Sequence, residues 1–330
     1  MSRDLRALPK AHLHVHLEGA MRPDTLRELC ARDGIPVPEI RGYGTFTEFA
    51  STYVAACEVM RTPDDLRRMV FEVVEDAALA GCVWVEPSFY AGHHVQRLGS
   101  EHDIWEMLME FGVEAGARFG VGVGWMAALD RTYGDDDAER VTALALALHN
   151  SGAPIVSFGL HNDEVGFPPE LFADQFARAG AAGLLRTPHA GELEGPASVR
   201  GAIHALGADR IQHGVRAVEE PDLLREIADR GIVLDVCPTS NVMLSVVPAI
   251  EQHPLPLLLD AGIRCSINGD DPLLFGPGIL EEYELCREVL GLTDDQLAGI
   301  ARASLEGSGA PADLVATGVA QIDAWAGVPA

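Results

Sequence analysis

The segment at residues 11–19, AHLHVHLEG, constrains the fold more than any other part of the chain. Histidine and aliphatic residues alternate in it, which is typical of a β-strand whose successive side chains point to opposite faces. His12, His14 and His16 are therefore expected on one face. Three imidazoles side by side are costly to bury without partners, and a metal ion is the simplest common partner. A solvent-exposed polar strand face without metal is the alternative interpretation.

Size and charge narrow the class of protein. The chain has 330 residues, of which 48% are hydrophobic and 6% aromatic, an ordinary globular composition. Its formal net charge of -26 repels phosphate backbones, so nucleic acid is not an expected partner. No apolar run suits a membrane span, no signal peptide is visible, and the six cysteines form no C-x-x-C pair. A cytoplasmic protein is therefore predicted.

Strand and helix patterns alternate along the rest of the chain. Eight apolar segments are each followed by a helical segment, which predicts an α/β fold, a parallel (β/α)8 TIM barrel with extra helices, in a single domain over residues 1–330. The strands are expected around residues 12–17, 82–87, 121–128, 154–160, 184–189, 210–213, 232–237 and 264–268. A doubly wound open sheet also alternates, but residues 17–20 are not the Gly-rich phosphate loop that it would normally carry.

Polar residues gather where four of these strands end, and barrels of this type place their chemistry at that end. They are His14, His16, Glu18, His189, Glu192, His213, Asp270 and Asp271. A lone histidine or aspartate is usually structural, but their accumulation at one end predicts a site. The three histidines His14, His16 and His189 with one of the two aspartates form a ligand set that suits zinc, with iron, cobalt or manganese as alternatives.

One metal ion is expected rather than two. A second ion usually needs a bridging group such as a carboxylated lysine on the fourth strand, and Lys10, the only lysine, lies just ahead of the first strand. A bound metal lowers the pKa of water from 15.7 to roughly 7, which makes hydroxide available at neutral pH. His213 is expected to orient that hydroxide or take its proton, and Glu192 to supply a proton to the substrate.

Four segments resemble the motifs of the adenosine deaminase family. They are residues 14–16 (HVH), 187–192 (TPHAGE), 210–214 (RIQHG) and 270–272 (DDP), and the resemblance extends from about residue 8 to about residue 290. It implies a zinc barrel that adds water to C6 of a 6-aminopurine and releases ammonia. The implied ligands of the single Zn2+ are His14, His16, His189 and Asp270.

The same resemblance implies roles for the other residues of the site. Glu192 would protonate purine N1, and His213 with Asp270 would hold the hydroxide. Asp271 would contact purine N7, and Glu18 would bond a sugar hydroxyl.

Two further segments are implied to meet the substrate. Residues 42–60, with Phe46 and Phe49, would form a lid. The family places a glycine whose backbone contacts purine N3 after the fourth strand. Here residues 159–164 read GLHNDE, so Asn162 takes that place, and both Gly159 and Asn162 are expected beside the substrate.

The resulting function is hydrolytic deamination of a small aminopurine, with adenosine or 2′-deoxyadenosine as the first substrates. Adenine, aminodeoxyfutalosine and N6-substituted adenosine are alternatives. Asn162 departs from the adenosine pattern, and residues 237–241 (CPTSN) resemble the related adenine and aminodeoxyfutalosine deaminases as much as the adenosine enzymes. A metal-dependent esterase, lactonase or phosphotriesterase would normally need the bridging lysine. The full set of acid, base and ligand residues argues against an inactive binding protein. His12 is expected in the core or supporting a ligand, and the sequence predicts no oligomeric state.

Overall fold

The computed structural model describes residues 2–40, 43 and 45–327, and its strands form one parallel sheet. Neighbouring strands follow the order β1-β2-β4-β5-β6-β7-β8-β9, and β3 pairs with β2. The strands are β1 (Lys10–His16), β2 (Cys82–Phe89), β3 (Gly122–Val123), β4 (Trp125–Asp130), β5 (Ile155–His161), β6 (Leu185–Ala190), β7 (Arg210–His213), β8 (Val233–Val236) and β9 (Arg264–Ile267). This is the parallel barrel that the sequence predicts.

Contacts just beyond the end of β9 close the barrel onto β1. Val15 forms a parallel bridge with Asp270, the His16 amide donates to the Asp270 carbonyl at 3.1 Å, and the Asp270 amide donates to the carbonyl of His14 at 3.1 Å. The side-chain oxygen of Asn268 accepts from the His14 amide at 3.1 Å. The closure therefore holds two of the predicted metal ligands on β1 against a third.

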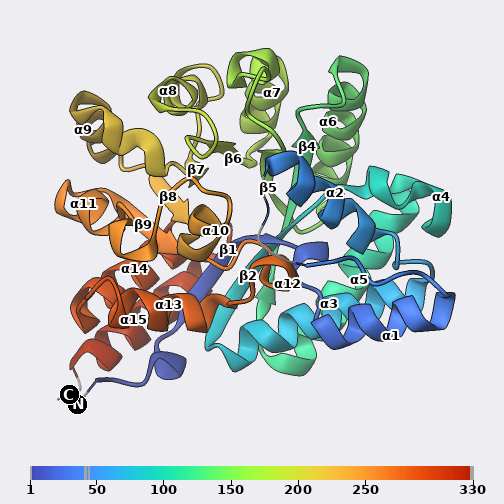
Figure 1. Ribbon diagram of the computed structural model, residues 1–330, viewed down its shortest axis with the longest axis horizontal. Helices are drawn as coiled ribbons and strands as arrows, with labels where there is room; N and C mark the ends of the chain where they lie inside the picture. The colour runs from blue at the N-terminus through green and yellow to red at the C-terminus, as the bar shows by residue number, and fades with distance from the viewer. Residues whose placement is uncertain (1, 41–42, 44, 328–330) are drawn as a thin grey trace.

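Helices surround the sheet (Figure 1). The first and last described segments of the chain lie side by side, where the guanidinium of Arg3 donates to the carbonyl of Ala326 at 2.8 Å. The α-helices are α1 (Pro23–Asp33), α2 (Phe46–Cys57), α3 (Pro63–Leu79), α4 (Val95–Leu98), α5 (Glu101–Phe119), α6 (Asp135–Asn150), α7 (Ala173–Ala182), α8 (Pro196–His204), α9 (Pro221–Arg230), α10 (Pro238–Met243), α11 (Leu255–Asp260), α12 (Pro272–Phe275), α13 (Ile279–Glu288), α14 (Asp294–Glu306) and α15 (Ala312–Gly327). The 3-10 helices are η1 (Leu5–Ala7), η2 (Glu18–Ala20), η3 (Ala91–His93), η4 (Pro169–Phe172), η5 (Val215–Glu219) and η6 (Ile250–Gln252). Capping boxes begin α2, α3, α5 and α14.

The third predicted strand, 121–128, is divided into β3 and β4 in the structure. The division falls at Gly124, against which the indole of Trp84 packs. A Cβ atom at this position would lie 2.5 Å from Cζ2 of Trp84, so only glycine fits. Both pieces pair with β2, and the barrel order is therefore preserved.

A buried polar network fills the barrel below the strand ends. The guanidinium of Arg210 pairs with Glu86 at 2.8 Å and with Asp235 at 2.9 Å. Asp235 also accepts from the hydroxyl of Ser266 at 2.6 Å, and that hydroxyl accepts from the side-chain amide of Asn268 at 2.7 Å. Because each partner in this network is satisfied, the network fixes the side chain of Asn268, which holds the end of β1.

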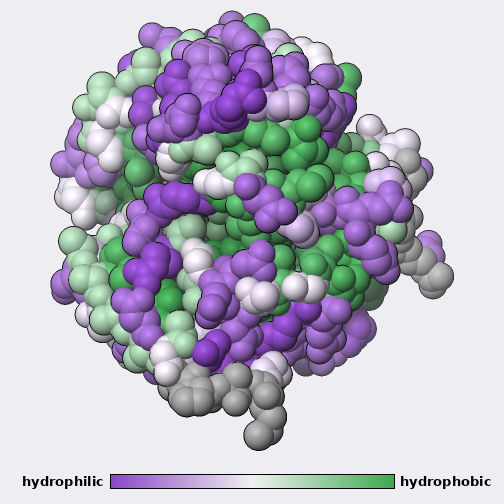
Figure 2. All heavy atoms as spheres, turned by 90° about the vertical axis from the view of Figure 1, so that its left-hand side faces the viewer, coloured by the Kyte–Doolittle hydropathy of each residue, from purple (hydrophilic) through white to green (hydrophobic). Residues whose placement is uncertain are grey.

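The surface of the barrel is mainly polar. Figure 2 shows hydrophilic residues along the outer ridges of one side and hydrophobic residues in the recesses between them. Large hydrophobic side chains that reach solvent are scattered singly, as Leu79, Val113 and Leu257 illustrate. Within the described residues, every helix is too short or too polar to traverse a lipid bilayer.

Candidate active site

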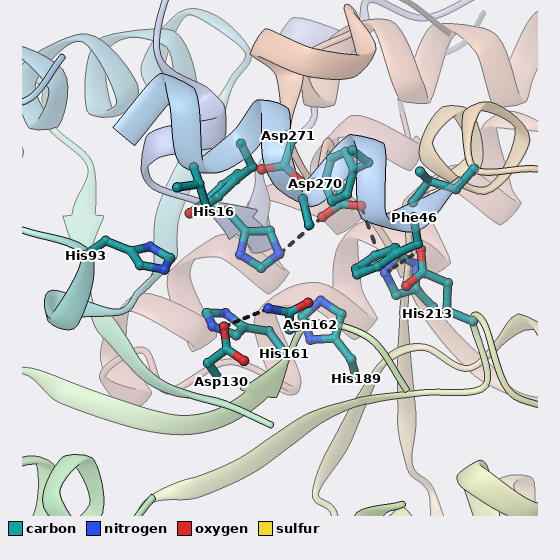
Figure 3. Close-up of a pocket in the computed structure, with 16 residues that line it drawn as sticks. His16, Phe46, His93, Asp130, His161, Asn162, His189, His213, Asp270 and Asp271 are labelled. Atoms are coloured by element: carbon teal, nitrogen blue, oxygen red, sulfur yellow. Dashed lines mark hydrogen bonds and ion pairs between the residues drawn. The ribbon is translucent and has the colours of Figure 1, made fainter. Parts of the chain in front are cut away.

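Four of the predicted ligands converge at the carboxyl ends of the strands. His14 and His16 come from β1, His189 from β6, and Asp270 from the segment after β9. One donor atom of each lies within 4.8 Å of the donor atoms of the other three. Asp270 Oδ1 lies 3.2 Å from Nε2 of His14. It also lies 3.3 Å from Nε2 of His16, and Figure 3 marks this second contact. These separations match the ~3.3 Å between ligands that tetrahedral zinc requires.

The ring orientations also point to a cation. Nδ1 of His14 lies 3.0 Å from the carbonyl of Asp235, and Nδ1 of His189 lies 2.9 Å from the carbonyl of Leu160. Each carbonyl can only accept, so each Nδ1 carries the proton and each Nε2 keeps its lone pair. The two Nε2 atoms nevertheless lie 3.1 Å apart. Two lone pairs that face one another in a buried site are stabilised by a positive ion between them.

Strained backbone marks the same region. Asn162, His213 and Asp270 have φ angles of 76°, 65° and 57°. A side chain makes this left-handed conformation unfavourable, and such residues persist where surrounding contacts determine them. All three line the pocket, so the strain lies at the site.

Two buried carboxyl groups face the pocket beside the cluster. Oε1 of Glu192 and Oδ1 of Asp271 have no hydrogen-bond partner in the part of the chain that the structure describes. Burial, with the nearby carboxylate of Asp270, raises the pKa of Glu192 well above its ordinary value. Burial and Asp270 likewise raise the pKa of Asp271, although His16 opposes the shift. Both groups are therefore suited to donate a hydrogen bond or a proton to a bound molecule.

Glu164 holds the backbone that carries Glu192. Its carboxylate accepts from the amides of Gly191, Glu192 and Leu193 at 3.1, 2.8 and 3.0 Å, and from the Ser198 hydroxyl at 2.6 Å. Four donors on one buried carboxylate fix this turn. Glu164 is the last of residues 159–164, and the sequence predicts no role for it.

Gly19 makes room for the carboxyl group of Asp271. A Cβ atom at Gly19 would lie 1.6 Å from Oδ1 and 2.5 Å from Cγ of Asp271. The glycine that ends the segment at residues 11–19 is therefore required by the aspartate that follows β9, although the two residues lie far apart in the sequence.

His213 lies at the end of β7 between the cluster and Glu192. Its Nε2 is 3.4 Å from Oε1 of Glu192 and 3.9 Å from Oδ2 of Asp270. Burial, with the neighbouring ring of His14, lowers the pKa of His213 well below its ordinary value, so the ring is neutral.

Helix α2 covers one side of the pocket. Phe46, Phe49 and Tyr53 from this helix line the pocket, and the helix lies within residues 42–60, the predicted lid. Phe49 stacks on Phe275 of α12 with ring centroids 5.2 Å apart. The predicted lid at residues 42–60 also includes residues 42 and 44, which lie outside the described residues.

Three further polar residues line the pocket, two of which were not predicted as site residues. Asp130 and His161 are the last residues of β4 and β5, and His93 ends η3. Their places at strand ends gave a signal that would have found the first two. The side-chain amide of Asn162 donates to Asp130 at 2.7 Å, and its oxygen accepts from the next amide at 2.8 Å (Figure 3).

His161 is the unpartnered member of this group. Its side chain is only 8% exposed, and its ring nitrogens have no hydrogen-bond partner within the described residues. Burial, with the nearby His16 and His93, lowers the pKa of His161 well below its ordinary value. A neutral ring that faces the pocket can both donate and accept one hydrogen bond.

Two expected pocket residues lie elsewhere. The carboxylate of Glu18 is buried and accepts from Tyr53 at 2.8 Å and from His94 at 2.7 Å, so it lies behind the pocket wall. Gly159 lies within β5, where a Cβ would meet the sulfur of Met126 at 2.7 Å, and it does not line the pocket.

His12 was expected in the core or supporting a ligand, but it does not share the face of His14 and His16 on which the alternation placed it. A shift of register between His12 and Val15 interrupts the alternation in β1. The two residues line the same recess outside the pocket, and Nε2 of His12 accepts from the Gly269 amide at 3.0 Å. His12 therefore supports the segment that precedes Asp270.

A parallel eight-stranded barrel with a histidine and aspartate cluster at the carboxyl ends of its strands is the architecture of an amidohydrolase-type enzyme.

Comparison with known proteins places the chain within this class. It belongs to the adenosine deaminase family, whose model matches residues 9–325. A putative adenosine/adenine deaminase from Streptomyces virginiae is 40% identical over 98% of both chains. An aminodeoxyfutalosine deaminase from Streptomyces avermitilis is 36% identical over 98% of this chain and 94% of the relative.

Two solved structures extend the comparison. An adenine deaminase from Arthrobacter aurescens has a TM-score of 0.90 at 30% identity, over 97% of this chain and 99% of that one. An amidohydrolase from Burkholderia ambifaria with bound Zn has a TM-score of 0.85 at 28% identity, over 98% of this chain and 92% of that one.

Proposed function

We propose that the protein is a hydrolytic deaminase of uncharged 6-aminopurines that uses one zinc ion per chain. The observation that carries this proposal is the presence of two carboxyl groups, those of Glu192 and Asp271, beside the cluster. Both present buried, unpartnered carboxyl oxygens with raised pKa values next to the donor cluster. N1 and N7 of an aminopurine are hydrogen-bond acceptors on either side of C6. Two protonated carboxyl groups therefore match its two acceptors.

The cluster of His14, His16, His189 and Asp270 would hold the ion. When bound, zinc would supply Lewis acidity, which lowers the pKa of water to about 7. Oδ1 of Asp270 faces the histidines, whereas Oδ2 faces His213, so this carboxylate can bind and accept a proton at different atoms.

The protein side chains complete the proton balance of the reaction. Glu192 gives its proton to N1 while the oxygen of water adds to C6. Asp271 holds N7. The C6–N6 bond then breaks, and one proton of the water reaches the departing ammonia through Oδ2 of Asp270. The other restores Glu192, and the product keeps a carbonyl at C6 and a proton on N1.

The lack of a cationic side chain in the described pocket lining selects against nucleotides. Its lining includes the carboxyl groups of Asp130, Glu192, Asp270 and Asp271, and no arginine or lysine among the described residues. A phosphate would enter this pocket without a cationic partner.

Adenosine and 2′-deoxyadenosine are the first candidates, because His161 offers an unused polar ring to a substituent outside the purine contacts. Adenine is the second candidate. It is favoured by the burial of Glu18 behind Tyr53, which removes the contact expected for a sugar hydroxyl.

Ammonia release from a substrate panel tests the proposal. Protein of measured metal content is mixed with adenosine, 2′-deoxyadenosine, adenine, AMP, N6-methyladenosine and aminodeoxyfutalosine. We expect turnover of an uncharged aminopurine and little of AMP. Glu192→Gln should bind the same amount of zinc and lose activity by roughly 10²- to 10⁴-fold. No ammonia from any of these compounds would contradict the proposal, as would an active Glu192→Gln enzyme.

A further inference from the structure

Two buried residues behind His213 form a hydrogen-bonded chain that reaches away from the pocket. The side-chain nitrogen of Asn241, on α10, lies 3.1 Å from Nδ1 of His213. The side-chain oxygen of Asn241 is 3.1 Å from Nε2 of His253. His253 and Asn241 are 3% and 0% exposed, and neither lines the pocket.

A backbone amide sets the direction of every bond in this chain. The amide of Leu255 lies 3.1 Å from Nδ1 of His253 and can only donate, so this Nδ1 is an acceptor. A neutral ring with a bare Nδ1 carries its proton on Nε2, which therefore donates to the oxygen of Asn241. The nitrogen of Asn241 in turn donates to Nδ1 of His213.

The opposite assignment is excluded by the same amide. Reversing the carboxamide of Asn241 would make it donate to Nε2 of His253, which would move the proton of that ring to Nδ1. That proton would then face the amide hydrogen of Leu255 across 3.1 Å. Two donors facing one another in a buried position leave both unsatisfied, which costs about 1–3 kcal/mol for each group.

We propose that Asn241 and His253 are positioning residues that hold His213 as the tautomer protonated on Nε2. The catalytic consequence rests on the proposed function, whereas the tautomer itself does not. With Nδ1 occupied by the hydrogen of Asn241, the proton on Nε2 points toward Glu192 and Asp270. The sequence is compatible with two roles for His213, orienting the attacking oxygen or taking its proton. A protonated Nε2 orients that oxygen and cannot take a proton from it.

The tautomer is measured directly by 15N NMR on the full-length protein labelled at histidine nitrogens, with and without zinc. Protonated and bare imidazole nitrogens differ widely in chemical shift. The signals of His213 are identified by their loss in His213→Asn. We expect Nε2 of His213 to carry the proton. A proton on Nδ1 of His213 in the wild-type protein overturns the proposal, whatever the enzyme does with aminopurines.

A matched pair of variants tests the role of His253. His253→Gln keeps an acceptor for Leu255 and a donor for Asn241, whereas His253→Glu has nearly the same shape and offers acceptors only. We expect the glutamine variant to keep the wild-type tautomer and kcat within about threefold. The glutamate variant should move the proton to Nδ1 and lower kcat on the order of 10²-fold with little change in KM. Equal kcat and equal tautomers in the two variants would contradict the proposal.

Asn241→Asp is the second test if His253→Glu does not fold. Aspartate still accepts from His253 but can no longer donate to His213, so it demands a proton on Nδ1. We expect the same change of tautomer and the same loss of kcat at unchanged zinc content. If Nε2 of His213 stays protonated and kcat is unchanged, the hydrogen-bonded chain does not set the tautomer. Failure of every variant and of the wild type to release ammonia, with the predicted tautomer present, would count against the deaminase function alone.

Discussion

Gly19 and Asp271 show how a single atom can determine whether a site is assembled. The Cβ of an alanine at position 19 would overlap the Asp271 carboxyl group, with Oδ1 1.6 Å away. We expect Gly19→Ala to turn this carboxyl away from the pocket. Because none of the four predicted ligands is altered, zinc content should stay the same while kcat/KM falls about tenfold or more. Metal analysis with steady-state kinetics checks this, and a wild-type kcat/KM in Gly19→Ala would contradict the role of Asp271.

Substitution of His161 tests whether this pocket-lining ring binds the substrate. We expect His161→Ala to raise KM for the preferred substrate about tenfold with little change in kcat, because a hydrogen bond to a bound substrate is worth about 1–1.5 kcal/mol. The exposed His204 on α8 pairs with Glu226 at 3.1 Å, and His204→Ala is the control for removing a histidine. If KM for both adenine and adenosine were unchanged in His161→Ala, this residue would have no part in substrate recognition.

At the scale of elements, the turn after β6 depends on the loop after β5. Glu164 accepts from three successive amides of that turn and from the hydroxyl of Ser198 on α8. Glu164→Gln replaces an acceptor with a donor that must face those amides, so Glu192 should lose its fixed position. We expect kcat to fall about 10²-fold while zinc content is retained. The exposed Glu170 offers the matched control Glu170→Gln, and equal kcat in the two variants would show that the turn positions itself.

The strands and the cluster of histidines and aspartate could be predicted because their signals are local. Apolar runs mark the strands, and the ends of parallel strands meet at one rim, which brings His189 to His14 without any knowledge of packing. The position of His12 could not be predicted this way, because a register shift in β1 breaks the alternation. The division of the third strand likewise depends on Trp84, whose place against Gly124 is a tertiary contact.

The roles of some polar residues depend on partners far away in the sequence. Glu18 follows the first motif, but Tyr53 and His94 bind its carboxylate and hold it outside the pocket. The carboxamide of Asn162 is held by Asp130. No pattern in a single sequence shows which of two adjacent polar groups will be claimed by a neighbour, so such side chains are assigned only from the folded structure.

At the scale of the whole molecule, the predicted ion would join distant parts of the barrel. Its ligands come from β1, β6 and the segment after β9. Zinc that binds only the folded state stabilises it by about 2.7 kcal/mol at a hundred times Kd. We therefore expect a chelator to lower Tm and added zinc to restore it. In His189→Ala, Tm should respond weakly to zinc, and a full response there would place the ion elsewhere.

Lys10 allows a pH prediction at the opposite end of the barrel. Its ammonium donates to the carbonyls of Leu5 at 2.9 Å and Ala80 at 2.7 Å, and burial lowers its pKa from 10.5 to about 8. Between these two values the unfolded chain binds the proton and the folded chain does not, so the contribution of Lys10 to stability rises with pH. The rise from pH 7.5 to pH 10 is about 2 kcal/mol.

Because Lys10 is the only lysine in the chain, protein labelled at the lysine side chain gives a single NMR signal whose titration reads this pKa directly. We expect a midpoint near 8. Urea unfolding of the wild type and Lys10→Met at the two pH values measures the same quantity, since groups common to both proteins cancel in the difference. A midpoint close to 10.5 would mean that water reaches the amine at the base of β1.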